Sequence, residues 1–160
     1  MGTLEKMTMP EWETTHATNL RAAFLATQAS VPAMRDNGGG AIIFTASVLG
    51  LVGDPDLPAY GAMKGGLRAL CRSAATAHGP DNGRCNTICP GDVETPLVQE
   101  FLNFQPAPEA ARKEITDRYP LRRLAQPADV AAASFLGSDD AAYITGTDIL
   151  VDGGLLARVY

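Results

Sequence analysis

The chain contains a short uninterrupted run of apolar residues, from Ala41 to Phe44, that is clearly bounded on both sides. Three glycines precede it, and a loop with several glycines and prolines follows it. Such a run is typical of a strand covered on both faces, as in a parallel sheet. Two further strands are predicted from Arg84 to Cys89 and from Thr147 to Val151. Together with the helical segments between them, they predict an α/β fold with about three parallel strands.

Apolar residues at helical spacing predict two long helices. The first begins at Thr8, which can form a capping box with Glu11, and runs to about Arg35. Its apolar stripe consists of Trp12, Leu20, Ala23, Phe24, Val31 and Met34. The second helix runs from about Ala59 to His78, with an expected buried face of Leu67, Leu70, Cys71, Ala74 and Ala75. Shorter helices are expected over residues 97–102, 109–119 and 127–137.

Composition excludes several classes of function. The 160 residues suffice for one domain with a core, and 46% apolar and 19% charged residues suit a soluble globular protein. The net charge of −5 argues against nucleic-acid binding, which requires an excess of positive charge. No apolar run approaches the roughly 18 residues of a membrane span, so a cytoplasmic location is the default expectation. The three cysteines, Cys71, Cys85 and Cys89, belong to no cluster with zinc spacing, and no metal site is predicted.

Candidate chemistry gathers around the first strand and the second long helix. Ser47 follows the carboxyl end of the strand, where ligands bind in open α/β sheets. Tyr60 and Lys64 lie four residues apart and therefore share one face of the helix. An ammonium at about 4 Å favours a phenolate by about 4 kcal/mol at an effective dielectric constant of about 20. We therefore expect Lys64 to lower the pKa of Tyr60 from about 10 toward 7, which would make Tyr60 a general acid and base.

These residues resemble a known signature. Ser47, Tyr60 thirteen residues later and then Lys64 resemble the catalytic residues of the classical short-chain dehydrogenases/reductases. Asn19 resembles the asparagine that completes the catalytic tetrad of that family. The segment from Pro90 to Thr95, PGDVET, is similar to its PGxVxT motif. Ile144-Thr145-Gly146 and Val151-Asp152-Gly153-Gly154 resemble the flanks of its last strand, so the resemblance covers nearly the whole chain.

The resemblance implies a function and a cofactor. The fold would be the C-terminal portion of a Rossmann-like, doubly wound parallel sheet. The reaction would be hydride transfer between NAD or NADP and a small alcohol/carbonyl substrate. Tyr60 would be the acid and base, Ser47 would orient the carbonyl, and Asn19 would support a proton relay from Lys64. The cofactor-binding residues implied are Tyr60, Lys64, Pro90, Gly91, Val93 and Thr95.

The resemblance also assigns other parts of the chain. Residues 96–126 correspond to the variable substrate lid of the family, and the two long helices correspond to its dimer interface. A homo-oligomer, dimer or tetramer, is therefore expected. The lid carries four arginines that could attract an anionic substrate, although such charges usually form a solvated face. They are Arg112, Arg118, Arg122 and Arg123.

The glycine-rich phosphate loop of the family has no counterpart among the 160 residues. Gly38-Gly39-Gly40 follows a helix and precedes a strand, whereas a phosphate loop requires the reverse order. We therefore expect residues 1–160 to form a single partial domain, the catalytic half, with weak or no activity alone. The alternative is a catalytically silent fragment that self-associates through its helices. A 3-oxoacyl thioester, a steroid, a polyol and a cyclic alcohol all remain candidate substrates, and NAD is not distinguished from NADP.

Overall fold

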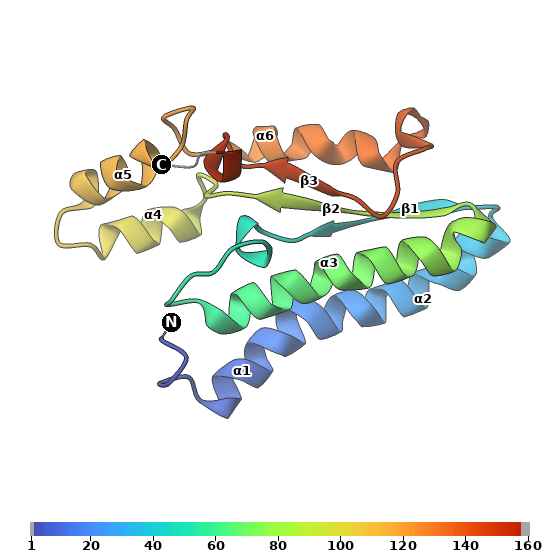
Figure 1. The fold of residues 1–160 in the computed structure, drawn as a ribbon, viewed down its shortest axis with the longest axis horizontal. Coiled ribbons are helices and arrows are strands. Elements are labelled where there is room, and N and C mark those ends of the chain that lie inside the picture. The colour runs from blue at the N-terminus through green and yellow to red at the C-terminus, as the bar shows by residue number, and fades with distance from the viewer. Residues whose placement is uncertain (1, 158–160) are drawn as a thin grey trace.

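A computed structural model describes residues 2–157, so both ends of the predicted 1–160 domain lie outside the described residues. Within this range the chain forms a parallel sheet with helices on both faces (Figure 1). The strand order is β1 (Gly40–Thr45), β2 (Gly83–Pro90) and β3 (Asp148–Val151). Thr45 pairs with Ile88 and Pro90 with Val151, so the three strands end along one edge. The predicted α/β fold with about three parallel strands is confirmed.

The first long helix contains a wide turn that the sequence analysis did not predict. It consists of α1 (Met9–His16), a π-helical turn (Ala17–Arg21) and α2 (Ala22–Asp36). The capping box predicted for its start is present, because the Thr8 and Glu11 side chains each bond to the backbone of the other residue. The apolar stripe expected along this helix is not fully buried at any position in the described structure.

The second long helix, α3 (Pro58–His78), packs against one face of the sheet beside α2 (Figure 1). A chain reversal follows in a 3-10 turn (Gly79–Asp81), where Asn82 adopts a left-handed conformation. The core between α3 and the sheet consists of Phe44, Leu67, Cys71, Ala74, Ala75 and Cys85. All three cysteines are free and buried, as predicted for Cys71 from its place on the apolar face of the helix.

The opposite face of the sheet is covered by α6 (Pro127–Ala131) and a 3-10 helix (Ala132–Gly137), followed by a short 3-10 turn (Asp139–Ala141). The sequence analysis predicted one continuous helix over residues 127–137, so this prediction was wrong in detail. The 3-10 helix places Ala133 and Leu136 in a second hydrophobic core. The other members of this core include Ile88, Ala141, Ile43, Val130 and Ile149.

The helices α4 (Pro96–Asn103) and α5 (Pro108–Asp117) extend beyond the end of the sheet to which the strand arrows point (Figure 1). The second of these ends two residues earlier than predicted, so Tyr119 lies outside the helix. A last 3-10 turn (Leu155–Ala157) follows β3. Among the described residues, no helix is both long and apolar enough to cross a membrane.

Candidate active site

Ser47 lies directly beyond β1, at the edge where the strands end. The Ala46 N–H donates to the Ile88 carbonyl at 2.8 Å, so the chain remains paired with β2 one residue past the strand. Ser47 itself is buried, and its hydroxyl accepts a hydrogen bond from the Leu49 N–H at 3.1 Å. That bond caps a 3-10 turn, η2 (Val48–Gly50). The position of Ser47 is therefore fixed by the strand on one side and by the turn on the other.

The η2 turn rests on the helix that carries Tyr60 and Lys64. A Cβ atom at Gly50 would lie 2.8 Å from the Lys64 carbonyl carbon, and one at Gly61 would lie 3.0 Å from the Leu49 carbonyl oxygen. Neither distance leaves room for a side chain. The small residues of this helix allow α3 to pack against η2 and, at Gly66, against the side chain of Leu20.

Lys64 connects the helix to the strand that precedes Ser47. Its buried ammonium group donates to the Thr45 carbonyl oxygen at 2.8 Å. The same nitrogen lies 5.3 Å from the centre of the Tyr60 ring, which is within the range of a cation–π contact. Ser47, Tyr60 and Lys64 are thus brought together at the carboxyl end of β1, where the sequence analysis expected them.

The acidity of this group differs from the sequence-based expectation. Burial raises the pKa of the Tyr60 phenol above its usual value, and a hydrogen bond with the Ser47 hydroxyl opposes that change in pKa. Burial also lowers the pKa of Lys64. The pKa of Tyr60 is therefore raised, and not lowered toward 7 as the four-residue spacing predicted, while the Lys64 ammonium is directed at the Thr45 carbonyl and the ring face. The phenol therefore keeps its proton at neutral pH.

Asn19 lies in the π-helical turn, which contacts α3. Its side-chain amide is partly buried and donates to the Thr15 carbonyl at 3.1 Å. In the described structure, no direct hydrogen bond joins the Asn19 side chain to Lys64. Wide turns of this kind are common at functional sites, because the extra residue redirects the local side chains and carbonyl groups. The relay role given to Asn19 remains a prediction.

The PGDVET segment leaves β2 at the same edge of the sheet. A Cβ atom at Gly91 would lie 2.8 Å from the Tyr119 hydroxyl, so this close approach requires glycine. The Tyr119 hydroxyl accepts from the Asp92 N–H at 2.7 Å and donates to the Asp92 carboxylate at 2.8 Å. Burial raises the pKa of Tyr119, which keeps the hydroxyl in its donating form. Tyr119 therefore fixes the conformation of the segment, a role that its sequence position did not reveal.

The predicted contacts of Val93 and Thr95 with a cofactor remain predictions. Val93 forms an isolated bridge with Ala125, which places its backbone at the edge of the lid segment, residues 96–126. Thr95 occupies the N-cap position of α4, but its hydroxyl makes no capping hydrogen bond. The Thr95 hydroxyl can therefore form a hydrogen bond with another group.

The four lid arginines form ion pairs within the chain. Arg112 binds the carboxylate of Glu94 through two hydrogen bonds, at 2.6 and 3.0 Å. The remaining pairs are Arg118 with Glu114, Arg122 with Asp117, and Arg123 with Asp129. Each guanidinium group thus has a carboxylate partner, which reduces its attraction for an anionic substrate. The pairing of Arg112 with Glu94 could not be derived from sequence, because it depends on how α5 folds over the PGDVET segment.

Comparisons with known proteins show the family of the chain. The profile of a family described as enoyl-(acyl carrier protein) reductase matches residues 1–156. A crystal structure of an oxidoreductase of the short-chain dehydrogenase/reductase family, from Burkholderia thailandensis, superposes with a TM-score of 0.87 and 38% identity over 98% of the chain. The chain belongs to the short-chain dehydrogenase/reductase family.

Two further known proteins are similar to the chain. A cyclohexanol dehydrogenase from an Acinetobacter species is 35% identical over 159 residues, or 99% of the chain. The structure of ElxO with NADP bound superposes with a TM-score of 0.91 at 25% identity over 99% of the chain. The chain spans 60% of the cyclohexanol dehydrogenase, 60% of the Burkholderia protein and 63% of the ElxO chain.

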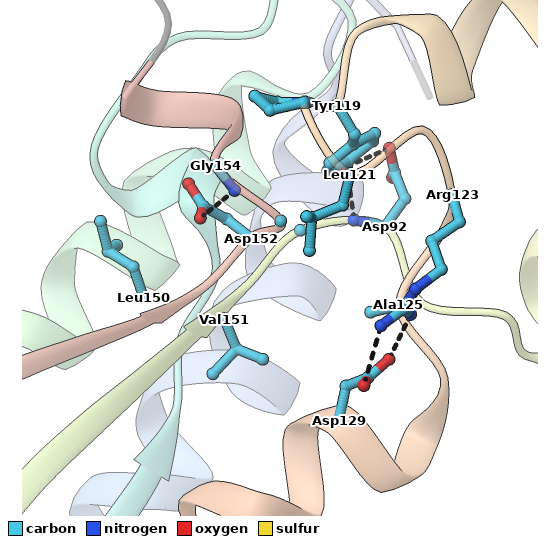
Figure 2. Close-up of a pocket in the computed structure, with 13 residues that line it drawn as sticks. Asp92, Tyr119, Leu121, Arg123, Ala125, Asp129, Leu150, Val151, Asp152 and Gly154 are labelled. Atoms are coloured by element: carbon cyan, nitrogen blue, oxygen red, sulfur yellow. Dashed lines mark hydrogen bonds and ion pairs between the residues drawn. The ribbon is translucent and has the colours of Figure 1, made fainter.

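A cavity of about 520 Å³ lies beyond the carboxyl ends of β2 and β3 in this short-chain dehydrogenase/reductase (Figure 2). It is lined by Gly91 and Asp92 of the PGDVET segment, and by residues of the lid, α6 and the VDGG segment. Ser47, Tyr60 and Lys64 do not line it. The polar groups drawn in Figure 2 bond to one another, as in the Arg123–Asp129 pair, and Asp152 accepts from the Gly154 N–H at 3.0 Å.

Proposed function

We propose that the chain is the catalytic portion of a nicotinamide-dependent oxidoreductase that interconverts an alcohol and a carbonyl compound. The observation that carries this proposal is the junction of Ser47, Tyr60 and Lys64 at the carboxyl end of β1, where the Lys64 ammonium contacts both the Thr45 carbonyl and the Tyr60 ring. The family of the chain supports the reaction type.

The roles of the three residues follow from their chemistry. In carbonyl reduction, the protonated Tyr60 hydroxyl donates a proton to the substrate oxygen, and in alcohol oxidation it accepts that proton. The raised pKa of Tyr60 suits the donating role. The Ser47 hydroxyl donates a hydrogen bond to the same oxygen and orients it. Lys64 stabilises the phenolate that remains after proton transfer, because an ammonium group close to an anion lowers its energy.

The donor groups at this edge fit the nicotinamide half of NAD or NADP. A nicotinamide ring supplies or accepts the hydride when it is bound. The Lys64 ammonium and Tyr60 hydroxyl can bind a ribose, and the Val93 backbone and the uncommitted Thr95 hydroxyl can bind a carboxamide. Pro90 and Gly91 shape the adjacent turn. The NADP bound to the ElxO structure supports this class of cofactor, without separating NAD from NADP.

Within this reaction type, we favour an uncharged alcohol over a 3-oxoacyl thioester. The family description, enoyl-(acyl carrier protein) reductase, supports the thioester. The ion pairs of the four lid arginines support the uncharged alcohol, because these groups are already neutralised. The exposed apolar residues of the lid support it as well. They are Leu97, Phe101, Phe104 and Leu121. The cyclohexanol dehydrogenase relative is consistent with such a substrate.

The proposal is tested by joining the chain to the dinucleotide-binding half of a related short-chain dehydrogenase/reductase and assaying the product with NADH and NADPH against cyclohexanone and a 3-oxoacyl thioester. Tyr60→Phe is expected to lower the turnover rate by about 10²- to 10⁴-fold, the usual contribution of general acid–base catalysis. Tyr143→Phe is the matched control, since Tyr143 is fully exposed on the surface. A turnover rate of Tyr60→Phe within about threefold of the parent, far less than the expected loss of about 10²-fold or more, would exclude Tyr60 from the mechanism. Saturable self-association without any turnover would support the catalytically silent alternative.

A further inference from the structure

Arg68 lies one helical turn beyond Lys64 on α3, and the roles proposed above do not use it. Its guanidinium group is largely buried, with 19% of the side chain exposed. One of its nitrogens, Nη1, donates to the Gly50 carbonyl oxygen at 2.6 Å. This bond reaches the last residue of the η2 turn, the turn that Ser47 begins.

The other side of the guanidinium group is held by β3. Nε and Nη2 of Arg68 both donate to the Asp148 carboxylate, at 3.0 and 2.7 Å. Asp148 also accepts a hydrogen bond from the Thr87 hydroxyl of β2. Burial would raise the pKa of Asp148, but the bonds from Arg68 and Thr87 hold that pKa below its usual value. The carboxylate is therefore charged at neutral pH and fixes the orientation of the guanidinium plane.

We propose that Arg68 is a positioning residue that holds the Ser47 turn against the helix bearing Tyr60 and Lys64. This inference rests on the proposed function of these three residues. The η2 turn is joined internally by the Gly50 N–H, which donates to the Ser47 carbonyl at 3.0 Å. A displacement of Gly50 is therefore transmitted to Ser47. Arg68 prevents that displacement by connecting the Gly50 carbonyl to a charged anchor in β3.

Arg72 provides a natural comparison on the same helix. Its Nη1 lies 3.7 Å from the same Asp148 oxygen, but 53% of its side chain is exposed. Among the described residues, Arg72 makes no hydrogen bond to the η2 turn. Arg68→Met and Arg72→Met thus each remove a positive charge near Asp148, whereas only Arg68→Met removes the bond to Gly50.

The first readout is backbone amide hydrogen exchange, measured by NMR on the unmodified chain and both variants. The informative amides belong to Leu49, Gly50 and Leu51, which bond within the η2 turn. In Arg68→Met these three amides are expected to exchange about tenfold faster or more, because a hydrogen bond to a charged group is lost. Amides of β2 are expected to exchange at rates close to those of Arg72→Met. Arg68→Lys, which keeps the charge, is expected to fall between the parent and Arg68→Met.

The second readout is the titration of Tyr60, followed by the chemical shift of its labelled ring. In Arg68→Met the Ser47 hydroxyl is no longer correctly placed, so the acid dissociation constant of Tyr60 is expected to fall by about twofold to tenfold. In Arg72→Met this constant is expected to stay unchanged. If Arg68→Met does not fold, Arg68→Lys and Asp148→Asn allow the same comparison.

Two results would overturn the positioning role. One is faster exchange that affects the η2 and β2 amides equally, since that indicates a general loss of stability. The other is an unchanged Tyr60 titration in Arg68→Met. Both readouts are independent of turnover, so absence of enzymatic activity would contradict the proposed function without deciding the role of Arg68.

Discussion

The Lys64 ammonium lies 5.3 Å from the centre of the Tyr60 ring, yet its hydrogen bond goes to the Thr45 carbonyl. Lys64 therefore faces the aromatic surface of Tyr60 and not its hydroxyl group. This arrangement leaves burial as the main influence on the phenol, and burial raises its pKa. The ion pair expected from the four-residue spacing would form only after Tyr60 has lost its proton.

Because the pKa of Tyr60 is raised in the folded chain, the free energy of unfolding should decrease as the pH rises in the alkaline range. The folded chain keeps the phenol protonated at pH values where the unfolded chain, with a pKa near 10, has lost the proton. The stability contributed by Tyr60 is full below about pH 10 and is lost as the pH rises through the raised pKa. The parent should therefore lose more unfolding free energy between about pH 9 and about pH 11 than Tyr60→Phe, as measured by urea denaturation. Tyr143→Phe is the control and should follow the parent.

Lys64 acts in the opposite direction, because its pKa is lowered by burial. Its contribution to stability rises with pH up to its ordinary value of about 10.5, and it is present in both the parent and Tyr60→Phe. The difference between these two proteins therefore isolates the phenol. Identical alkaline stability curves for the parent and Tyr60→Phe would contradict the prediction.

Gly50 is expected to tolerate no larger residue. A Cβ atom there would lie 2.8 Å from the backbone of Lys64, and the backbone cannot move aside as a flexible side chain can. We expect Gly50→Ala to destabilise the protein by about 1 to 3 kcal/mol, a typical cost of overpacking. Gly53→Ala is the matched control, since a Cβ atom at Gly53 meets no atom within 4 Å. Chemical denaturation of both variants measures the difference, and equal stabilities would show that the η2 turn shifts freely.

The ion pair between Arg112 and Glu94 is expected to hold the lid. It joins α5 to the PGDVET segment, and both side chains are partly exposed. A pair of this kind contributes about 0.2 to 1 kcal/mol, so Arg112→Met should speed chymotrypsin cleavage near the exposed Phe104 by up to about fivefold. Arg118→Met removes an arginine that pairs with Glu114 on the same helix, so it controls for the loss of charge. Equal cleavage rates in the two variants would exclude a role of the pair in holding the lid.

The outer face of the two long helices is expected to mediate self-association. A groove of about 390 Å³ between them is lined by His16, Leu20, Arg21, Phe24, Gly66 and Leu70. The side chain of Phe24 is 48% exposed and that of Leu25 is 52% exposed, which leaves apolar surface uncovered. Sedimentation of the parent should show dimers or larger species at tens of micromolar, and Phe24→Glu should shift the distribution toward the monomer.

Phe104→Glu is the control for self-association, because Phe104 is exposed in the loop between α4 and α5 and does not line the groove. It should leave the sedimentation profile unchanged. A parent that is strictly monomeric in this concentration range, roughly where modest interfaces persist, would contradict the prediction.

The sequence predicted the parts of the fold that depend on local pattern. The strand before Ser47, the capping box of Thr8 and the helix carrying Tyr60 and Lys64 follow from apolar runs and capping residues, and the structure contains each of them. Such patterns do not predict the position of Asn86, because its side chain is polar and yet buried. It is buried in β2, where its amide donates to the Ile144 carbonyl at 2.8 Å and accepts from the Thr147 N–H at 3.2 Å.

The candidate site was predictable to the same extent. The spacing of Ser47, Tyr60 and Lys64 predicted that they would meet, because strand and helix geometry fix their directions. The spacing did not predict the orientation of the Lys64 ammonium, since this depends on a carbonyl at the end of β1. The role of Tyr119 was missed for a similar reason, because Asp92 lies 27 residues away in sequence. Contacts of this kind depend on tertiary packing.

The π-helical turn at Ala17–Arg21 determines how the first long helix can change in length. Each residue of an α-helix advances about 100° around the axis, and the wide turn contains one residue more than a regular α-helical turn would. Deleting a residue within Ala17–Arg21 would restore regular winding with little loss of hydrogen bonding. Deleting a residue of α2 between Ala22 and Ala26 would rotate the following segment by about 100° and turn Thr27 out of its buried position. Natural variation in the length of this helix should therefore concentrate at the wide turn.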